Sequence, residues 1–522
     1  EKWNQHFQTK FPIRTDVQEP LSDAIIPRQV FLLLDKTFQK KTCPDAYNRL
    51  RLAEHRALLM ASDHIGSARK ETRLPDWKYL EPKTFQTKGF DFRAFQRKLL
   101  TVKDDALLYA PTGSGKTEAA LCWLTANQQP NARFFYLLPY TASINAMTNR
   151  LEKIYGKECV TALHSKTLDF FYERFENEID NFYSGDGYEL TETERHSHNA
   201  NEARSLKSLS KELFFPVKVA TPHQVLRFAL MGKGWEMGLF DFRNACIVVD
   251  EFHAYEPLLT GLLLASIKWL KHDYFNAKVF FMSATIPKFL QDLIVEKIFG
   301  GDNSKLHAPS PIEPSDHAVL DQKHHQGFCQ AIFEKIKFTG SKKMLHSGFH
   351  RLDRKLIEDA ITHDDPNERP RLLVATQAVE VSLDIDYDVA FMENAPIDAL
   401  IQRFGRVNRK GKKGLAPVYV FEKIIGNTPF YDDAILSKTW EAMTALEAQA
   451  LSESDLVDAC NKVYEGGYTE VQLKDFNQGF NNSKINNFFE ALIAGDWGDW
   501  IKDLLENDNM KLDVLCENLL PQ

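Results

Sequence analysis

The sequence lacks several features that would place it in a special class of protein. It contains no run of eighteen apolar residues, so no membrane-spanning helix is expected, and its start shows no secretory signal. Its seven cysteines are dispersed and include no Cys-x-x-Cys pair. This pattern indicates reduced thiols and predicts a cytoplasmic protein.

An excess of positive charge is also absent. The formal net charge is −8, from 64 Lys and Arg against 72 Asp and Glu. This balance argues against capture of nucleic acid by bulk electrostatics, but it is compatible with a local basic groove. The 522 residues are 43% hydrophobic and 26% charged, which predicts a globular protein with three or four domains.

Short apolar runs alternate with helix-like stretches through the middle of the chain. This alternation is typical of parallel sheets with crossover helices. It predicts an α/β fold with two tandem RecA-like, parallel-sheet domains of the nucleotide-binding type. The runs lie at 106–110, 134–138, 217–220, 246–249, 279–282, 343–346, 372–375, 389–392 and 418–421.

Composition and pattern also predict the domain boundaries. No convincing strand precedes a helix expected at 328–335, and the chain starts at Glu1 within helix-like sequence, so we expect segments to be missing at both places. The expected parts are a helical remnant at 1–68, a linker at 69–88, a first α/β domain at 89–300 with a polar insertion at 166–212, a second α/β domain at 301–424, and a helical accessory domain at 425–522.

A phosphate-binding loop is predicted at 110–117, where APTGSGKT follows an apolar run and opens a helix-like stretch. Gly113 and Gly115 let the backbone curl and point N–H groups at phosphate oxygens. Lys116 would reach the β- and γ-phosphates, and the Thr117 hydroxyl would bind magnesium. The alternative is a chance turn. The loop residues assigned to nucleotide binding are Thr112, Gly113, Ser114, Gly115, Lys116 and Thr117.

Two adjacent acids, Asp250 and Glu251, follow the apolar run at 246–249. They are expected at the C-terminal end of a buried strand, where open α/β sheets bind ligands. One carboxylate would hold magnesium, and the other would orient or deprotonate a water that attacks the γ-phosphate. A solvated strand end is the alternative, and the phosphate loop upstream favours the catalytic interpretation.

Two weaker signals accompany this pair. Gln96 lies upstream of the phosphate loop, and its amide matches the donor and acceptor of an adenine edge, although a polar residue on a helix surface is the commoner case. Ser283 and Thr285 follow the run at 279–282, where their hydroxyls could link the site to the neighbouring domain or form an ordinary turn.

Arginines recur at three-residue spacing in QRFGRVNR at 402–409, so Arg403, Arg406 and Arg409 are expected on one helix face. Guanidinium groups stabilise charge that develops on a transferred phosphoryl group. Because they come from the second domain, catalysis would depend on domain closure. A solvated basic helix end is the alternative, but it does not explain Gln402 in register with them.

In their order, the phosphate loop, DEFH at 250–253, SAT at 283–285 and QRFGRVNR resemble superfamily 2 helicases. Three stretches narrow the resemblance to the CRISPR-associated helicase–nuclease of type I effector systems, over about residues 89–424. They are DEFHAYE at 250–256, LVATQAVEVSLDID at 373–386 and LHSGFHRLDR at 345–354. Upstream, ASDHIGS at 61–67 resembles the last motif of the HD nuclease domain that is fused to that helicase.

The resemblance implies an ATP-dependent helicase that moves 3′-to-5′ along single-stranded DNA, with Mg²⁺ as cofactor and an RNA-guided type I surveillance complex as partner. We expect a monomer without membrane contacts. The implied catalytic residues are Lys116, Asp250, Glu251, Arg403, Arg406 and Arg409, with Asp384 and Gln402 also at the nucleotide. The implied DNA contacts are Pro139, Tyr140, Thr141, His164, Ser165, Thr221, Gln224, His346, Ser347, Thr376 and Gln377.

Two rival functions stay open. One is a general superfamily 2 DNA or RNA helicase, against which the Ala254-Tyr255-Glu256 continuation and the HD-like tail argue. The other is a nucleic-acid-binding module that uses ATP only as a conformational switch, against which the intact Lys116 and Glu251 argue.

The nuclease of the family needs a His-Asp pair and further histidines, but residues 1–62 hold only His6 and His55 and no His-Asp dipeptide. Asp63 is the candidate for one surviving ligand, so a divalent transition metal is expected only in a complete HD domain. We therefore predict that this chain alone does not cut single-stranded DNA when Mn²⁺ or Ni²⁺ is added. Robust cutting in a nuclease assay would show that this account of the HD ligands is wrong.

Overall fold

The computed structural model describes most of the two α/β regions and the segments packed against them. It gives only the backbone for 64–67, 317–321 and 351–352. The described ranges are 45–67, 92–164, 215–308, 317–321, 333–346, 349–422 and 431–494, without 112, 335, 350, 364, 377–378, 380–384, 410–413 and 448, together with residues 167, 203 and 210. The predicted linker and nearly all of the predicted insertion lie outside them.

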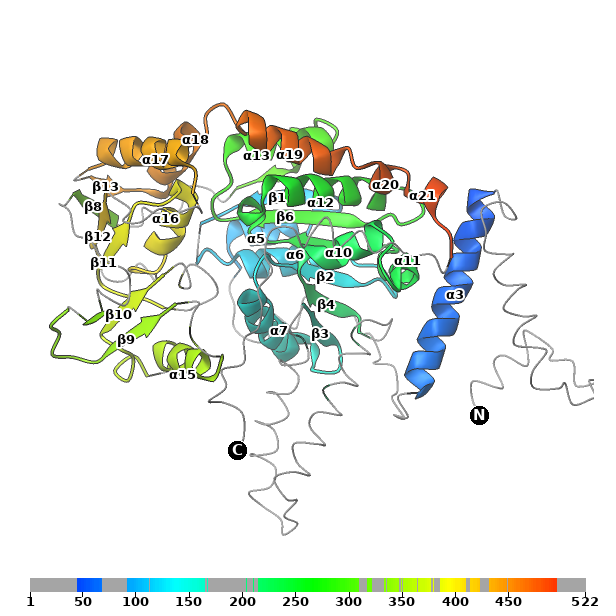
Figure 1. The fold of residues 1–522 in the computed structure, drawn as a ribbon, viewed down its shortest axis with the longest axis horizontal. Helices are drawn as coiled ribbons and strands as arrows, with labels where there is room; N and C mark the ends of the chain where they lie inside the picture. The colour runs from blue at the N-terminus through cyan, green and yellow to red at the C-terminus, as the bar shows by residue number, and fades with distance from the viewer. Residues whose placement is uncertain are drawn as a thin grey trace, which may run out of the picture.

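A seven-stranded sheet forms the first region, and all its neighbouring strands are parallel (Figure 1). The strand order is β3-β4-β2-β5-β6-β1-β7. Parallel sheets are buried on both faces, which explains the uninterrupted apolar runs. The strands are β1 (Ala106–Tyr109), β2 (Phe134–Leu137), β3 (Val160–Leu163), β4 (Val217–Ala220), β5 (Cys246–Val249), β6 (Lys278–Ser283) and β7 (Leu306–His307).

Alternate residues of each strand enter two different cores. In β2, Phe134 and Tyr136 join one core, whereas Phe135 and Leu137 join the other. The first core is shared with α5, α6 and α7, and the second with α10, α11, α12 and α13. Their bounds are α5 (Ala94–Leu99), α6 (Lys116–Asn127), α7 (Thr141–Tyr155), α10 (Pro222–Ala229), α11 (Gly238–Asp241), α12 (Pro257–Leu270) and α13 (Lys288–Lys297).

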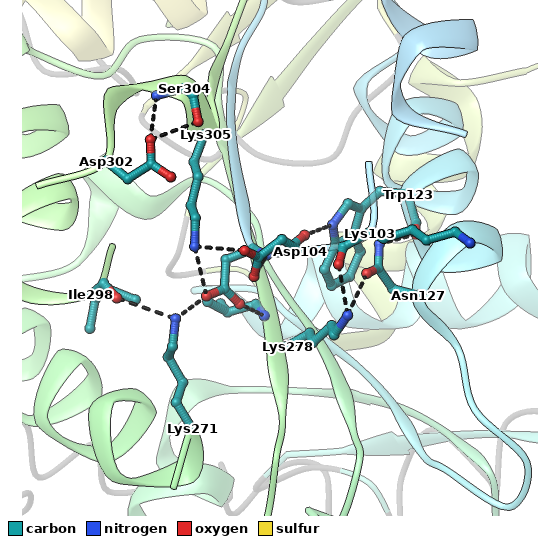
Figure 2. A network of polar contacts seen from close by, with 12 residues as sticks. Lys103, Asp104, Trp123, Asn127, Lys271, Lys278, Ile298, Asp302, Ser304 and Lys305 are labelled. Atoms are coloured by element: carbon teal, nitrogen blue, oxygen red, sulfur yellow. Dashed lines mark hydrogen bonds and ion pairs between the residues drawn. The ribbon is translucent and has the colours of Figure 1, made fainter. Parts of the chain in front are cut away.

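A polar network fixes the edge of this sheet where β1 begins (Figure 2). Asp105 is buried; its carboxylate accepts a hydrogen bond of 2.8 Å from the backbone N–H of Val279 and pairs with Lys271 near the end of α12. The neighbouring Asp104 lies 2.9 Å from Lys305, just before β7. These contacts hold the starts of β1, β6 and β7 together, because a buried carboxylate needs both its donors and its ion pair.

The second region contains two smaller sheets instead of one continuous parallel sheet in the part that the structure describes. One pairs β9 with β10 in parallel, and the other has the order β11-β12-β8-β13. The predicted α/β fold is therefore confirmed. The second of the two predicted RecA-like domains is only partly evident. The elements are β8 (His317–Asp321), β9 (Lys342–Leu345), α15 (Arg351–Ile361), β10 (Leu372–Ala375), β11 (Ala390–Glu393), α16 (Ile397–Phe404), β12 (Ala416–Phe421) and β13 (Ala450–Leu451).

All nine predicted runs coincide with strands to within two residues, but one expectation is wrong. A strand does precede 328–335: β8 lies parallel to β12. Its sequence, HAVLD, has only three apolar residues between polar ends, too short a run to indicate a strand by pattern. Its pairing with β12 and β13 supplies the hydrogen bonds that the local pattern does not reveal.

The described part of 425–522 contributes to both regions and differs from the separate accessory domain expected there. Helices α17 (Asp433–Ala445) and α18 (Glu453–Val463) share one core with α16 and β12, and β13 extends their sheet. The chain then crosses to the first region, where α19 (Glu470–Phe480), α20 (Ser483–Asn486) and α21 (Phe488–Ala491) pack beside α12 (Figure 1).

The helix expected within 1–68 is α3 (Ala46–Ser67), and it also packs on the first region. The side chain of Arg49 is buried and donates hydrogen bonds of 3.0 and 3.1 Å to the carbonyls of Leu492 and Glu490. Arg56 forms an ion pair of 2.7 Å with Glu236. The helix therefore joins the end of the described chain to the first region.

Two glycines allow α12 and α19 to cross at close range. A Cβ atom at Gly479 would lie 2.4 Å from the carbonyl oxygen of Leu258, and one at Gly261 would lie 2.2 Å from that of Phe476. Real Cβ atoms do not approach backbone oxygens so closely, so neither position accepts a larger residue without separating the helices.

Gly479→Ala tests this contact. Alanine normally stabilises a helix interior by about 1 kcal/mol relative to glycine, but here its methyl group would overlap backbone. We expect a net loss of about 1–3 kcal/mol from overpacking, measured by urea unfolding. Gln478→Ala, at the exposed neighbouring position, should change little. A midpoint for Gly479→Ala at or above that of the unmodified chain would contradict the close crossing.

Candidate nucleotide site

The loops that follow β1, β5 and β6 meet at one edge of the parallel sheet, and the phosphate loop lies between β1 and α6. Gly113 and Gly115 have φ of +79° and +91°, in the left-handed region. A Cβ at Gly115 would also lie 2.4 Å from Nε2 of Gln96. Both glycines are therefore required by backbone conformation, as the loop pattern predicts. Ser114 is buried in the same loop, and Thr112 lies outside the described residues.

Gln96 braces this loop from α5. Its Nε2 donates a hydrogen bond of 2.9 Å to the carbonyl of Gly115, and its Oε1 accepts one of 2.9 Å from the backbone N–H of Arg93. The side chain is buried. Its role at adenine stays a prediction, and the contacts here are with the loop backbone.

Thr117, at the start of α6, and Asp250, directly after β5, are both buried. Asp250 accepts hydrogen bonds of 2.8 Å from the Tyr136 hydroxyl and from the backbone N–H of Glu251. Burial, together with the charge of Glu251, raises the pKa of Asp250 to about 7, against smaller opposing effects of Lys116 and Tyr136. Buried Asp250, next to the half-buried Glu251 and a hydroxyl, fits a hard cation with oxygen ligands.

The backbone of Glu251 is in the left-handed region, with φ of +49°. Its Oε2 is buried and has no hydrogen-bond partner among the described residues, and it lies 3.6 Å from Nδ1 of His253. A strained conformation and an unsatisfied acceptor at one residue are typical of functional positions. The prediction that Glu251 positions a water has a geometric basis here.

His253 links the acid pair to the second region. Nε2 of Gln402, on α16, donates to Nε2 of His253 over 2.5 Å, so the ring carries its hydrogen on Nδ1. That Nδ1–H donates to the Ser283 hydroxyl over 2.6 Å. The Ser283 hydroxyl donates in turn to the carbonyl of Thr285 over 3.2 Å. One directional chain of hydrogen bonds therefore runs from α16 through the DEFH motif to the SAT motif.

The prediction that the three arginines share one helix face is wrong. Helix α16 ends at Phe404, and Gly405 caps it, so Arg406 and Arg409 lie beyond the helix. The backbone there joins a parallel bridge, in which Tyr387 N–H donates to the carbonyl of Arg406 over 2.9 Å. The capping glycine and this bridge end the helix, although the three-residue spacing of the arginines is typical of a longer one.

Two of these arginines have contacts within the second region, and the backbone of the third lies near the phosphate loop. Arg403 donates to the carbonyl of Glu393 over 3.3 Å, and buried Arg406 donates to that of Val379 over 3.0 Å. A Cβ at Gly113 would be 3.6 Å from the carbonyl oxygen of Arg409, so the second region abuts the phosphate loop. Asp384 lies outside the described residues.

The predicted DNA contacts are distributed over both regions. Pro139, Tyr140 and Thr141 lead from β2 into α7, and Tyr140 is 43% exposed. Thr221 caps the start of α10, with Gln224 in its first turn.

The remaining predicted DNA contacts have mixed surroundings. His164 is buried and hydrogen-bonds Asn145 over 2.8 Å, so it braces α7. His346 stacks on Phe349, and Thr376 N–H donates to the carbonyl of Leu345 over 3.1 Å. Ser165, Ser347 and Gln377 lie outside the described residues.

Sequence reasoning missed two residues at the site. Tyr136 of β2 donates to Asp250, and Nη1 of Arg150 on α7 donates to the Thr117 hydroxyl over 3.2 Å. Tyr136 lies in an apolar run, but a phenol in a strand buried on both faces needs a polar partner, and this was the available signal. Nothing in the local sequence indicates the contact of Arg150.

The segment predicted to be an HD remnant has no metal site in the part of the chain that the structure describes. Asp63 is exposed near the end of α3, and no group of three or more His, Cys, Asp or Glu side chains there could hold an ion. No described helix is long and apolar enough to cross a bilayer.

Family models match both regions. The model of DEAD/DEAH box helicases matches residues 93–293, and that of the C-terminal part of the CRISPR-associated nuclease/helicase Cas3 matches 323–412. A Cas3 nuclease/helicase of Methanocaldococcus jannaschii is 26% identical over 471 residues, which cover 82% of this chain and 61% of the relative. One of Streptococcus thermophilus is 26% identical and covers 72% of this chain and 50% of the relative.

Among solved structures, T. fusca Cas3 with AMPPNP shares the fold. Its TM-score is 0.55 at 19% identity, and the match covers 80% of this chain and 57% of that one. This chain therefore spans about half to three fifths of the length of the relatives that it matches. The family models and the relatives agree with one another. The helicase model covers the phosphate loop and the acid pair, and the Cas3 model covers the second region. Over both regions the chain is similar to CRISPR-associated Cas3 nuclease/helicases, and its first region matches the DEAD/DEAH box helicases.

Proposed function

We propose that this chain is an ATP-dependent motor that moves 3′-to-5′ along single-stranded DNA in CRISPR type I defence. The observation that carries the proposal is the meeting of Lys116, Thr117 and the Asp250–Glu251 pair at one sheet edge, with Gln402 of the second region bonded to His253. We interpret the two smaller sheets as parts of one second RecA-like domain, so the nucleotide would lie between two domains.

The residues of the first domain divide the chemistry among them. The backbone N–H groups of the loop and Lys116 bind and orient the phosphates. Thr117 and Asp250 would hold Mg²⁺, which supplies positive charge against the phosphoryl group that is transferred. Glu251 has a buried, unsatisfied oxygen beside this pair, which suits it to orient the attacking water.

The second domain supplies the part of the site that depends on closure. Arg406 and Arg409 are the candidates for the arginine that stabilises developing charge, and the contact of Arg409 with the Gly113 backbone supports their proximity. The hydrogen-bond chain from Gln402 to Thr285 would make the acid pair sensitive to the position of this domain. Hydrolysis would then alternate the two domains on the strand.

The DNA path is inferred from exposed and half-buried residues at the ends of strands and helices. Tyr140, Thr141, Thr221 and Gln224 lie at helix starts, where hydroxyls and backbone amides suit phosphate contacts that carry no sequence information. In the cytoplasm, an RNA-guided surveillance complex would expose the strand, and this chain would act on it as a monomer.

Nuclease activity would belong to a complete HD domain. The described residues do not supply its metal ligands, since Asp63 is exposed and has no cluster around it. We therefore assign no cleavage step to this chain.

Lys116→Ala tests the motor. Removal of a cation aimed at the phosphates should lower ATP hydrolysis stimulated by single-stranded DNA by about 100-fold or more, measured as phosphate release. Lys103→Ala, an exposed lysine at the opposite edge of the sheet, should hydrolyse ATP normally. Equal stimulation by RNA would favour a general helicase, and binding of ATP without turnover would favour a switch.

Gln402→Ala tests the link between the domains. It leaves the buried His253 acceptor without its donor, at a cost of about 1–3 kcal/mol. We expect DNA-stimulated turnover to fall about tenfold while the KM for ATP changes little. Gln449→Ala, an exposed glutamine elsewhere in the same region, is the matched control. Unchanged turnover in Gln402→Ala would show that the contact does not couple the domains.

A further inference from the structure

The Thr117 hydroxyl lies at the centre of a group of polar side chains from three other elements. Arg150 of α7 donates to it, Tyr136 of β2 lies beside it, and Tyr136 in turn donates to Asp250 at the end of β5. Thr117 itself is the second residue of α6 and is 8% exposed. With so little access to solvent, the direction of its hydrogen is set by these protein groups.

The hydrogen bonds in this group have a defined direction. Nη1 of Arg150 can only donate, and it donates to the Thr117 oxygen over 3.2 Å. The phenol hydrogen of Tyr136 is used on Oδ2 of Asp250 over 2.8 Å. Thr117 also lies beside Tyr136, and since the phenol has no second hydrogen, any bond between the two hydroxyls has Thr117 as its donor.

This arrangement determines what the Thr117 oxygen can offer. A hydroxyl has one hydrogen and two lone pairs. With the hydrogen turned to Tyr136 and one lone pair to Arg150, one lone pair is left. A hydroxyl that binds a cation has to turn its hydrogen away and present a lone pair. The group therefore holds Thr117 in the orientation that a cation requires.

Both supporting side chains are themselves fixed. Tyr136 is fully buried in the core and packs edge-on against Phe134, with ring centroids 6.2 Å apart. Arg150 is exposed, but its second terminal nitrogen forms an ion pair with Glu118, the residue after Thr117. Its planar fork therefore spans two adjacent residues of α6, which a lysine could not reproduce.

We propose that Tyr136 and Arg150 are positioning residues for the magnesium of this site: they orient the Thr117 hydroxyl, and Tyr136 also fixes Asp250. The proposal rests on the proposed function, because it assumes that a magnesium-bound nucleotide occupies the site. The plainer interpretation is a core tyrosine with a satisfied hydroxyl and an ion pair that joins α6 to α7. That interpretation predicts effects on stability but none on the need for Mg²⁺.

The test uses the full chain and a fluorescent ATP analogue, with binding measured in EDTA and across a Mg²⁺ titration. In Tyr136→Phe and Arg150→Ala, we expect the Mg²⁺ concentration for half-maximal tight binding to rise about tenfold or more, as for other residues that support metal ligands. Affinity in EDTA should stay unchanged, because neither residue contacts the phosphate loop glycines. Arg150→Lys keeps a donor and should show a smaller rise.

Two variants serve as matched controls. Lys153→Ala removes an exposed positive charge from the same helix as Arg150, and Tyr155→Phe removes a buried phenol hydroxyl on that helix. Both should keep the Mg²⁺ requirement of the unmodified chain. Thermal midpoints of all variants separate lost folding from lost positioning.

The outcomes distinguish the two proposals. If the unmodified chain binds the analogue more tightly with Mg²⁺ while Tyr136→Phe and Arg150→Ala show the same Mg²⁺ requirement, the positioning proposal is overturned and the nucleotide site stands. If Lys116→Ala binds the analogue as well as the unmodified chain does, the nucleotide site itself is wrong, and the positioning proposal falls with it.

Discussion

The parallel register of the first sheet is the constraint on which the site depends. Tyr109 pairs with Ser283, Leu137 with Val249, and Val249 with Phe281, so the strands end at nearly the same level. Because every neighbouring pair is parallel, the loops after these strands must leave at one edge. The phosphate loop, the acid pair and the SAT motif are then neighbours, although more than a hundred residues separate the first from the second. The network around Asp105 holds the opposite edge in place.

The same geometry concentrates negative charge in a buried place. Burial and Glu251 raise the pKa of Asp250 to about 7, so the ionised pair is unfavourable without further positive charge beside it. The chain offsets this only in part, through the charge of Lys116, the Tyr136 hydroxyl and the Glu251 N–H. A site that is fully compensated by its own residues would have little affinity for a cation. Partial compensation favours binding, because the cation supplies the charge that the protein leaves out.

How much of this could be predicted depends on whether the signal is local. The apolar runs predict strands, and Gly113 and Gly115 predict a curled loop, each from a few neighbouring residues. Both predictions agree with the fold. Strand β8 was missed because its stability comes from pairing with distant strands. The prediction that the three arginines share one helix face is wrong because the helix ends at Phe404, where Gly405 caps it. Tyr136 and Arg150 meet their partners only in space, so no spacing rule could indicate them.

The path of the chain limits how the two regions can move. Helices α17 and α18 complete the core of the second region, yet α19 packs on α12, which begins just after the DEFH motif. Between α18 and α19, Gly466 and Gly467 have φ of +96° and +75°, so the connection turns sharply. Residues of α18 also face a small cavity with Tyr109 and Thr285 of the first region. Any motion that separates Gln402 from His253 must therefore either displace α18 from this edge or bend the glycine connection, and the catalytic edge is coupled to the second region by an apolar contact as well as by the polar one.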